Sequence, residues 1–289
     1  MTSNSSLGKV YLVGAGPGAA DLITVRGAKL LEKAQIVFHD ALVEPEMLAL
    51  CPQALKVPVG KRCGKLSSAQ HFINKRLVDA AKQYKTVVRL KGGDPMLFGR
   101  ADEEIGALKK LGIEVEVVPG ITAALAGAAS LQQSLTLRGV SRSVAFVTLA
   151  QANQETGPKA EQTQPMSNPN ADTLVYYMGR KDAAKIAQQL LNQERHEQSN
   201  AGRNHHANTP VHVLEAVSTK RERHWSSTLG ELAKGAADAW FDSSSPALIM
   251  VGEALRDTAK TKESLESSSS KIHDGLQNRQ ILPNGRRCA

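Results

Sequence analysis

Short apolar runs rich in β-branched residues alternate with longer helical patterns along this chain, and no other feature constrains its fold as strongly. In the first series, the expected strands are residues 10–13, 36–38, 56–59, 86–90 and 114–118, and the expected helices are residues 25–34, 67–82, 102–111 and 122–130. Gly112 is placed to end the third of these helices just before a strand. Strands that alternate with helices in this way predict an α/β fold built on a parallel sheet.

A second series follows, with expected strands at 143–148, 173–177, 211–215 and 247–251 and expected helices at 182–192 and 229–237. Two polar inserts, near 151–171 and 192–209, have the composition of mobile loops. We therefore expect two α/β domains, at residues 8–140 and 141–257, with the functional cleft between them. The serine-rich tail at 258–289 has little apolar content, and we expect it to be disordered.

The composition limits what the chain binds. Of its 289 residues, 41% are hydrophobic, which supports a globular core. Only 4% are aromatic, which argues against a surface that stacks nucleic-acid bases. The formal charge of +8 comes from scattered basic residues. They favour a solvated surface, or a cleft that attracts an anionic small molecule, over a nucleic-acid partner.

The same inspection indicates the compartment. The polar first residues lack the apolar stretch of a signal peptide, and no run reaches the roughly 18 apolar residues of a membrane span. The three cysteines, Cys51, Cys63 and Cys288, form no C-x-x-C pair. We therefore expect a reduced, cytoplasmic protein with no metal site and no membrane association.

The stretch "GAGPG" follows the first expected strand and raises the question of a nucleotide cofactor. Gly14 and Gly16, with Asp40 about 20 residues further on, match a dinucleotide-binding pattern. Pro17, however, has no N–H to donate to a phosphate, and the helix begins only after Thr24, its expected N-cap. The turn therefore favours a ligand without phosphates. An NAD-dependent oxidoreductase is the alternative from another class.

Two further strands end in glycine turns. After the strand at 86–90 come Gly92, Gly93 and Asp94, where a ligand can approach the backbone closely. Pro95 holds Asp94 extended, so we expect its carboxylate to project rather than to cap a local turn. After the strand at 114–118, Thr122 opens a helix and either contacts a ligand or caps that helix.

A third loop, "VGKRCG", places two cations between glycines. Lys61 and Arg62 suit the recognition of carboxylates, Arg62 through its planar fork and Lys61 as a point charge or proton donor. The alternative is that both are solvated surface cations.

These stretches together resemble the tetrapyrrole methylases, which are methyltransferases that use S-adenosylmethionine. The resemblance spans residues 9 to about 256 and is carried by "GAGPG", "HDALV", "VGKRCG", "VRLKGGDPMLFGR", "VVPGITAA", "SLTLRG", "YYMGR" and "SPALIMVG". It implies two α/β domains with the active site between them, and a homodimer. It also implies methylation of carbons 2 and 7 of uroporphyrinogen III to give precorrin-2, the branch point toward sirohaem and cobalamin. A methyltransferase acting on a later precorrin intermediate would share the fold and the donor.

The resemblance also implies roles for individual residues. Asp40 would be a proton acceptor and Lys61 a proton donor, while Arg62 and Arg138 would contact the substrate carboxylates. The S-adenosylmethionine site would comprise Pro17, Gly92, Gly93, Asp94, Leu97, Thr122, Ala123, Met178 and Val217.

The chain departs from the family pattern at three places. Ala41 stands where the family usually has an arginine, Leu149 and Ala150 replace the end of a "TGH" motif, and Val217 takes the place of a glycine. These departures concern contacts with the substrate arms and with the adenine edge, but not the reaction class.

Overall fold

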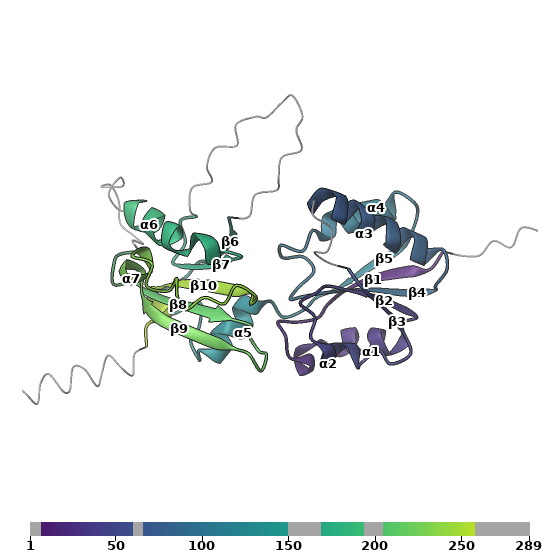
Figure 1. Cartoon of the computed structure of the whole chain (residues 1–289), viewed down its shortest axis with the longest axis horizontal. Helices are drawn as coiled ribbons and strands as arrows, with labels where there is room; N and C mark the ends of the chain where they lie inside the picture. Colours follow the sequence, from purple (N-terminus) through teal and green to yellow (C-terminus); the bar gives the residue numbers. More distant parts are fainter. Residues whose placement is uncertain (1–6, 60–65, 150–168, 194–204, 258–289) are drawn as a thin grey trace, which may run out of the picture. The chain divides into compact units, whose positions relative to one another are not determined.

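The computed structural model describes residues 7–59, 66–149, 169–193 and 205–257 (Figure 1). These residues form two five-stranded sheets, which belong to one compact unit that ends at Leu255. The predicted inserts fall largely outside the described residues, and the predicted tail at 258–289 lies wholly outside them. None of the described helices has the length and apolar character that crossing a bilayer requires.

The first sheet is entirely parallel, as predicted, with the strand order β3-β2-β4-β1-β5. Its strands are β1 (Lys9–Gly14), β2 (Ile36–His39), β3 (Leu55–Pro58), β4 (Thr86–Lys91) and β5 (Val115–Val118). Its helices are α1 (Val25–Lys33), α2 (Pro45–Leu48), α3 (Leu66–Ala81) and α4 (Ala101–Lys109), with a short 3₁₀ turn at Ala20–Leu22. The four-residue helix α2 was not predicted.

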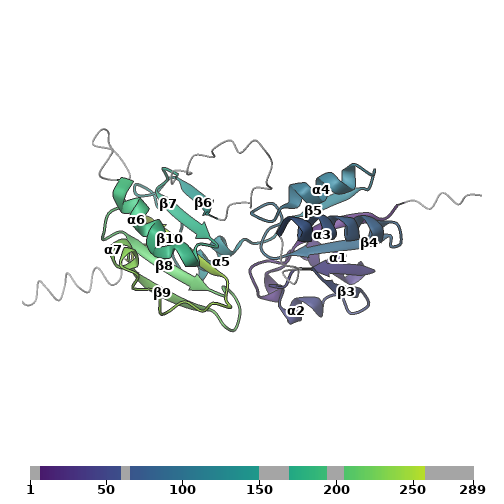
Figure 2. The same ribbon diagram turned by 45° about the horizontal axis from the view of Figure 1, so that its top comes forward.

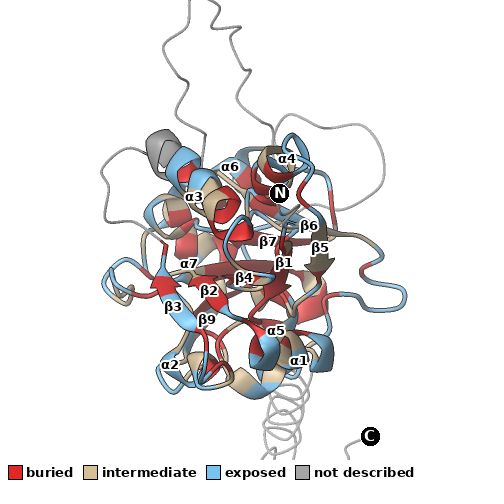
Figure 3. Cartoon of the chain, turned by 90° about the vertical axis from the view of Figure 1, so that its right-hand side faces the viewer, coloured by how far each residue is buried: buried red, intermediate tan, exposed pale blue. Residues whose placement is uncertain are grey.

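Helices cover both faces of this sheet (Figure 1). On one face, Leu77 of α3 and Leu108 of α4 pack in a core cluster with Val10 and Leu12 of β1. On the other face, Leu31 of α1 belongs to a separate cluster with residues of the same strands. Strands covered on both faces are expected to be apolar throughout, and Figure 3 shows the central strands of this sheet as mainly buried.

The second sheet is mixed, with the order β6-β7-β10-β8-β9. It comprises β6 (Val144–Thr148), β7 (Thr173–Tyr177), β8 (Pro210–Glu215), β9 (Arg223–Thr228) and β10 (Ala247–Gly252). Only β6 and β7 pair in parallel; the other neighbours pair antiparallel. The edge strand β9 was not predicted, because its sequence RHWSST is polar and half exposed and carries little apolar signal.

Three helices pack on this second sheet: α5 (Ala123–Ser130), α6 (Ala183–Gln193) and α7 (Leu229–Ala233). Short 3₁₀ turns lie at Arg180–Asp182 and Glu253–Leu255. Residues of α6 and α7 share one core cluster, and Ala124 and Ala128 of α5 belong to another. Figure 2 shows α6 and α7 beside the strands of this sheet. Helix α5 therefore packs on the second sheet although it directly follows β5 of the first. The domain boundary near residue 140 stays a prediction.

Candidate functional site

Most of the residues singled out in the sequence follow the strand ends of the first sheet. Because these strands are parallel, their carboxyl ends lie at one edge, with Gly14 in register with Lys91 and His39 in register with Leu90. The segments after β1, β2, β4 and β5 therefore meet there, bringing together Pro17, Asp40, the Gly92 turn and Thr122. Ligands of open α/β sheets bind at this edge.

Glycines at this edge allow backbone segments to touch. A Cβ on Gly14 would lie 2.6 Å from Gly120 Cα, and a Cβ on Gly120 would lie 2.3 Å from Gly93 O. Gly16 and Gly93 exchange two backbone hydrogen bonds of 3.2 and 2.7 Å, and both have positive φ, 76° and 68°. Apart from Gly92 and its two chain neighbours, no heavy atom of the described residues lies within 4 Å of a Cβ built on Gly92. Gly92 therefore leaves room beside the backbone, whereas the other four glycines join the strand ends.

Contrary to the prediction, the carboxylate of Asp94 does not project from the turn. Its Oδ1 accepts a hydrogen bond of 2.8 Å from Met96 N, and its Oδ2 accepts one of 2.9 Å from Gly120 N. The first amide is two residues along the chain, and the second belongs to the turn after β5. Asp94 thus holds the β4 and β5 turns together. Leu97 belongs to the same turn, with its N–H donated to Asp94 O at 3.3 Å.

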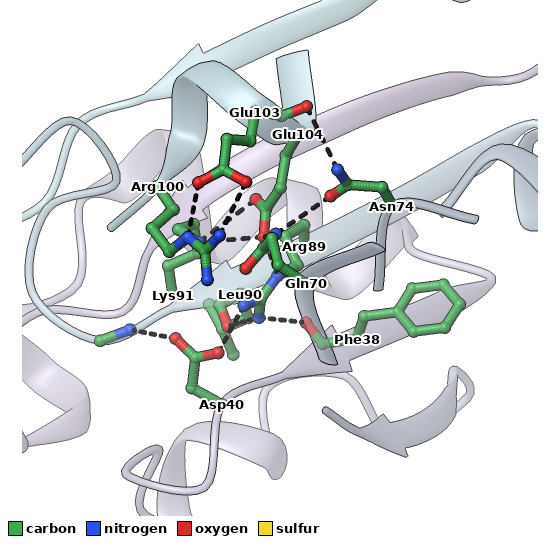
Figure 4. Close-up of polar contacts among 11 residues, drawn as sticks. Phe38, Asp40, Gln70, Asn74, Arg89, Leu90, Lys91, Arg100, Glu103 and Glu104 are labelled. Atoms are coloured by element: carbon green, nitrogen blue, oxygen red, sulfur yellow. Dashed lines mark hydrogen bonds and ion pairs between the residues drawn. The ribbon is translucent and has the colours of Figure 1, made fainter. Parts of the chain in front are cut away.

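Asp40 lies directly after β2 and is bound to an arginine of the neighbouring strand (Figure 4). Its Oδ1 accepts a hydrogen bond of 2.5 Å from Arg89 Nη2, and its Oδ2 lies 3.4 Å from Gly92 N. The Arg89 side chain is buried, at 3% exposed, while that of Asp40 is 33% exposed. Asp40 therefore presents a carboxylate to solvent at the sheet edge, while a buried arginine binds it from the protein interior.

Arg89 is part of a larger buried network that also contains Glu104 of α4 and Lys91 of β4 (Figure 4). Arg89 Nε donates to Glu104 Oε1 at 3.1 Å, and Lys91 Nζ donates to both Glu104 oxygens at 3.1 and 3.2 Å. Gln70 Nε2 donates to Glu104 Oε1 at 3.3 Å. With Asp40, the network holds two carboxylates and two cations, so its formal charges offset each other.

Burial and the charges in this network together shift the pKa values of its two cations in opposite directions. Burial by itself would lower the pKa of Arg89, but the negative charges of Asp40 and Glu104 outweigh it, and the pKa is raised. Burial lowers the pKa of Lys91, and the positive charge of Arg89 adds to that effect, while Glu104 opposes it. Arg89 is therefore a permanent cation on the buried side of Asp40.

Thr122 opens α5, as predicted, but its hydroxyl contacts a tyrosine of the second sheet rather than an amide of its own helix. Thr122 Oγ1 lies 2.5 Å from the hydroxyl of Tyr177, which also accepts a hydrogen bond of 3.2 Å from Ala124 N. Burial raises the pKa of Tyr177, although its hydrogen bond to Thr122 opposes this. The ring of Tyr177 lies 5.2 Å from that of Phe98. Ala123, between the two bonded residues, is half-buried.

The remaining predicted cofactor residues lie in two strained loops of the second sheet. Met178 follows β7, is 58% exposed and has a φ of 58°. Val217 follows β8 with its side chain buried in a core cluster, so only its backbone is available to a ligand. Its neighbour Ser218 accepts a hydrogen bond of 3.0 Å from Ala19 N through Oγ, next to Pro17 and Gly18. Non-glycine residues with positive φ are sparse and cluster at functional sites.

The three predicted cations are not joined to this edge by the described contacts. Lys61 and Arg62 lie outside the described residues. Arg138 is exposed in the turn closed by the bridge between Leu137 and Ser141. In the part of the chain that is described, no group of three or more His, Cys, Asp or Glu side chains could hold a metal ion.

None of the buried residues linked to Asp40 was predicted from the sequence. A signal for them was present, because Arg89 and Lys91 stand in the strand TVVRLK, whose residues are otherwise apolar apart from the first. Charged side chains are rarely buried unless they are paired. Their partner Glu104, however, lies on a helix 13 residues beyond Lys91, and the strand itself does not indicate it.

A family model described as Tetrapyrrole (Corrin/Porphyrin) Methylases matches residues 9–233 of this chain. The chain belongs to the tetrapyrrole methylase family. This membership confirms the predicted fold class and leaves the oxidoreductase alternative without support. The late start of the first helix agrees with this membership: α1 begins at Val25, after its N-cap Thr24, and not directly after Gly16 as in a dinucleotide-binding turn.

Named relatives of this tetrapyrrole methylase extend over most of its length. The uroporphyrinogen-III C-methyltransferase of Pseudomonas aeruginosa is 41% identical over 260 residues, which cover 90% of this chain and 99% of that protein. The siroheme synthase of Pseudomonas fluorescens is 40% identical over 263 residues, but the chain spans only 53% of its length. The chain thus spans about half of the siroheme synthases that it matches.

Solved structures of the family share the fold. The crystal structure of uroporphyrin-III C-methyl transferase from Thermus thermophilus, complexed with S-adenyl homocysteine, aligns with a TM-score of 0.67 and 36% identity. The alignment covers 86% of this chain and 94% of that one.

Proposed function

We propose that this tetrapyrrole methylase is a uroporphyrinogen-III C-methyltransferase. It transfers methyl groups from S-adenosylmethionine to carbons 2 and 7 of uroporphyrinogen III and forms precorrin-2, a precursor of sirohaem and cobalamin. The relative from Pseudomonas aeruginosa, 41% identical over nearly its whole length, supports this activity. The S-adenyl homocysteine bound to the Thermus relative supports the donor, because that molecule is what the donor becomes once its methyl group has left.

The position of Asp40 is the observation that carries the proposal. Its carboxylate is one third exposed at the edge where the β1 and β4 turns meet, next to the open backbone at Gly92. A reaction that produces a positive charge and then releases a proton needs an anionic group at such a place.

The chemistry assigns work to the other residues. The sulfonium methyl is already activated, so the enzyme mainly aligns it with an electron-rich pyrrole carbon. A carbon–carbon bond forms as the carbon–sulfur bond breaks, and the cationic ring then loses a proton, which Asp40 accepts. Any proton that Lys61 donates to the tetrapyrrole is matched by a second proton lost from the ring, so each methyl transfer still releases one proton in total. Arg62 and Arg138 bind carboxylates of the substrate.

The donor occupies the neighbouring turns. Its contacts come from Pro17, Gly92, Gly93, Asp94, Leu97, Thr122, Ala123, Met178 and Val217. Room beside Gly92, the exposed Met178 and the buried side chain of Val217 support this assignment. In it, Asp94 shapes the turn and Val217 contributes its backbone.

Product analysis tests the activity. The purified protein, incubated without oxygen with S-adenosylmethionine and uroporphyrinogen III, should yield a doubly methylated product by mass spectrometry. S-adenosylhomocysteine should inhibit it and raise its melting temperature, while NADH should do neither. If the protein methylates only an already methylated precorrin, the alternative of a later step is correct.

The Asp40→Asn variant tests the proton acceptor. The amide keeps the shape of the side chain but cannot act as a base, a role typically worth about 10²- to 10⁴-fold in rate. We expect methyl transfer to fall by that factor while the affinity for S-adenosylhomocysteine, measured by calorimetry, stays nearly unchanged. A variant whose only defect is weaker binding of the donor would make Asp40 a donor ligand instead.

We further propose that the enzyme is a cytoplasmic homodimer. The absence of a C-x-x-C pair among its three cysteines supports a reducing compartment. Supporting self-association, Leu125 of α5 and Phe146 of β6 are 53% and 37% exposed beside an open hollow of about 550 Å³. Sedimentation of the purified protein should give twice the chain mass, and a Leu125→Lys substitution should lower it.

A further inference from the structure

The buried network of Arg89, Glu104 and Lys91, which binds Asp40 through Arg89, is an inefficient way to stabilise a fold. The side chains of Arg89, Glu104 and Lys91 are 3%, 0% and 4% exposed. Replacing such a cluster by apolar residues is often neutral or stabilising, because removing charges from water offsets much of their mutual attraction. A role in fixing one arrangement of the site explains these charges better than a contribution to stability does.

The geometry of Arg89 identifies what is fixed. Its guanidinium donates in three directions: Nη2 to Asp40 Oδ1 at 2.5 Å, Nε to Glu104 Oε1 at 3.1 Å and Nη1 to Leu90 O at 3.0 Å. Three anchors define the plane of the group. Of the two carboxylates that it contacts, Glu104 is fully buried, and Asp40 is the one that reaches solvent.

We propose that Arg89 is a positioning residue for methyl transfer and that it acts through Asp40. This inference rests on the proposed function, in which Asp40 serves the reacting tetrapyrrole. Glu104 holds the arginine, the arginine holds Oδ1 of Asp40, and Oδ2 lies 3.4 Å from Gly92 N in the turn after β4. A lysine at position 89 would keep the charge but not the planar fork, so it could not hold both carboxylates in one geometry.

A double-substitution cycle tests this link. Asp40→Asn, Arg89→Lys and the two combined are compared with the wild type in methyl transfer from S-adenosylmethionine to uroporphyrinogen III. Arg89→Lys alone should lower kcat about 10- to 100-fold, the effect of a catalytic group misplaced by about 1 Å, with the KM for the donor unchanged. In the Asp40→Asn background it should lower kcat less than twofold further, because the group that it positions is already inactive.

A matched control separates positioning from a general loss of packing. Arg223 also binds a fully buried carboxylate through Nε and Nη2, that of Glu215 in the second sheet, at 2.9 and 2.7 Å. Arg223→Lys should lower the melting temperature but leave kcat within about twofold of wild type, compared with the loss of about 10- to 100-fold expected for Arg89→Lys.

The outcomes are distinguishable. If the losses from Asp40→Asn and Arg89→Lys multiply in the combined variant, or if Arg223→Lys lowers kcat as much as Arg89→Lys does, the positioning role is wrong and the proposed function stands. A wild type that does not methylate uroporphyrinogen III, although it binds S-adenosylhomocysteine, refutes the proposed function and this inference with it.

Discussion

Glu104→Gln should strongly destabilise the protein. The Glu104 carboxylate is fully buried and accepts hydrogen bonds from two cations, Arg89 and Lys91, and from the Gln70 amide. A glutamine has the same shape but no charge, and its NH₂ group would face a cation at a site that now holds an oxygen. One or both cations would then be buried without a counter-charge on this side.

The magnitude follows from this geometry. Removing one partner of a buried ion pair typically costs about 3–5 kcal/mol, a large share of the roughly 5–15 kcal/mol by which a folded domain is stable. At about 2–4 °C per kcal/mol for a chain of this size class, the melting temperature should fall by about 6–20 °C.

Urea unfolding followed by circular dichroism measures this loss against a neighbouring control. Glu103→Gln makes the same chemical change one residue away, where Glu103 and Arg100 form a pair with side chains 41% and 42% exposed. Exposed pairs contribute about 0–1 kcal/mol, so this control should unfold close to wild type. Equal unfolding midpoints for Glu104→Gln and Glu103→Gln would refute the reasoning.

The loss at Glu104 should also depend on pH, through Lys91. The pKa of Lys91 is already below its usual value of 10.5 in the folded protein, first because of burial. Between the folded and unfolded pKa values the unfolded chain binds more protons, so stability rises with pH across that window. Without Glu104 the folded pKa falls further and the window widens downward. The stability difference between Glu104→Gln and wild type should therefore shrink as the pH rises from the folded Lys91 pKa of the variant to that of the wild type, and a constant difference would contradict this account.

Two further predictions concern stability elsewhere. Gln132 follows α5 with a φ of 54°, and the bonds Gln132 N to Ala129 O and Gln133 N to Ala128 O, both 3.0 Å, form a helix C-cap that favours glycine. Gln132→Gly should therefore stabilise the protein by about 0.5–1 kcal/mol, and an unchanged or lower melting temperature would count against it. Tyr177→Phe removes the hydroxyl bonded to Thr122 and Ala124 N, and it should cost about 1–3 kcal/mol; urea unfolding identical to wild type would contradict that.

The sequence alone determined the features that depend on short stretches of chain. The alternation of apolar strands and helices predicted the parallel first sheet. Thr24 was predicted to be the N-cap of the first helix, and the hydrogen bond of 3.1 Å from Gly27 N to Thr24 Oγ1 confirms it. The glycine turns and the order of the motifs also identified the family. These signals are local, because side-chain periodicity and the backbone freedom of glycine act within a few residues.

Only the tertiary structure decided which distant groups meet. The strand sequences did not predict that β8, β9 and β10 pair antiparallel, because pairing depends on partners far along the chain. Asp94 was expected to project, but its oxygens bind amides that include Gly120 N, 26 residues away. Asp40 could be singled out from its strand, whereas its link to Arg89, 49 residues later, could not. The network of Asp40, Arg89 and Glu104 forms only once the neighbouring strands β2 and β4 and the packed helix α4 bring these residues together (Figure 4). Neither the strand order nor the helix packing is encoded in any one segment.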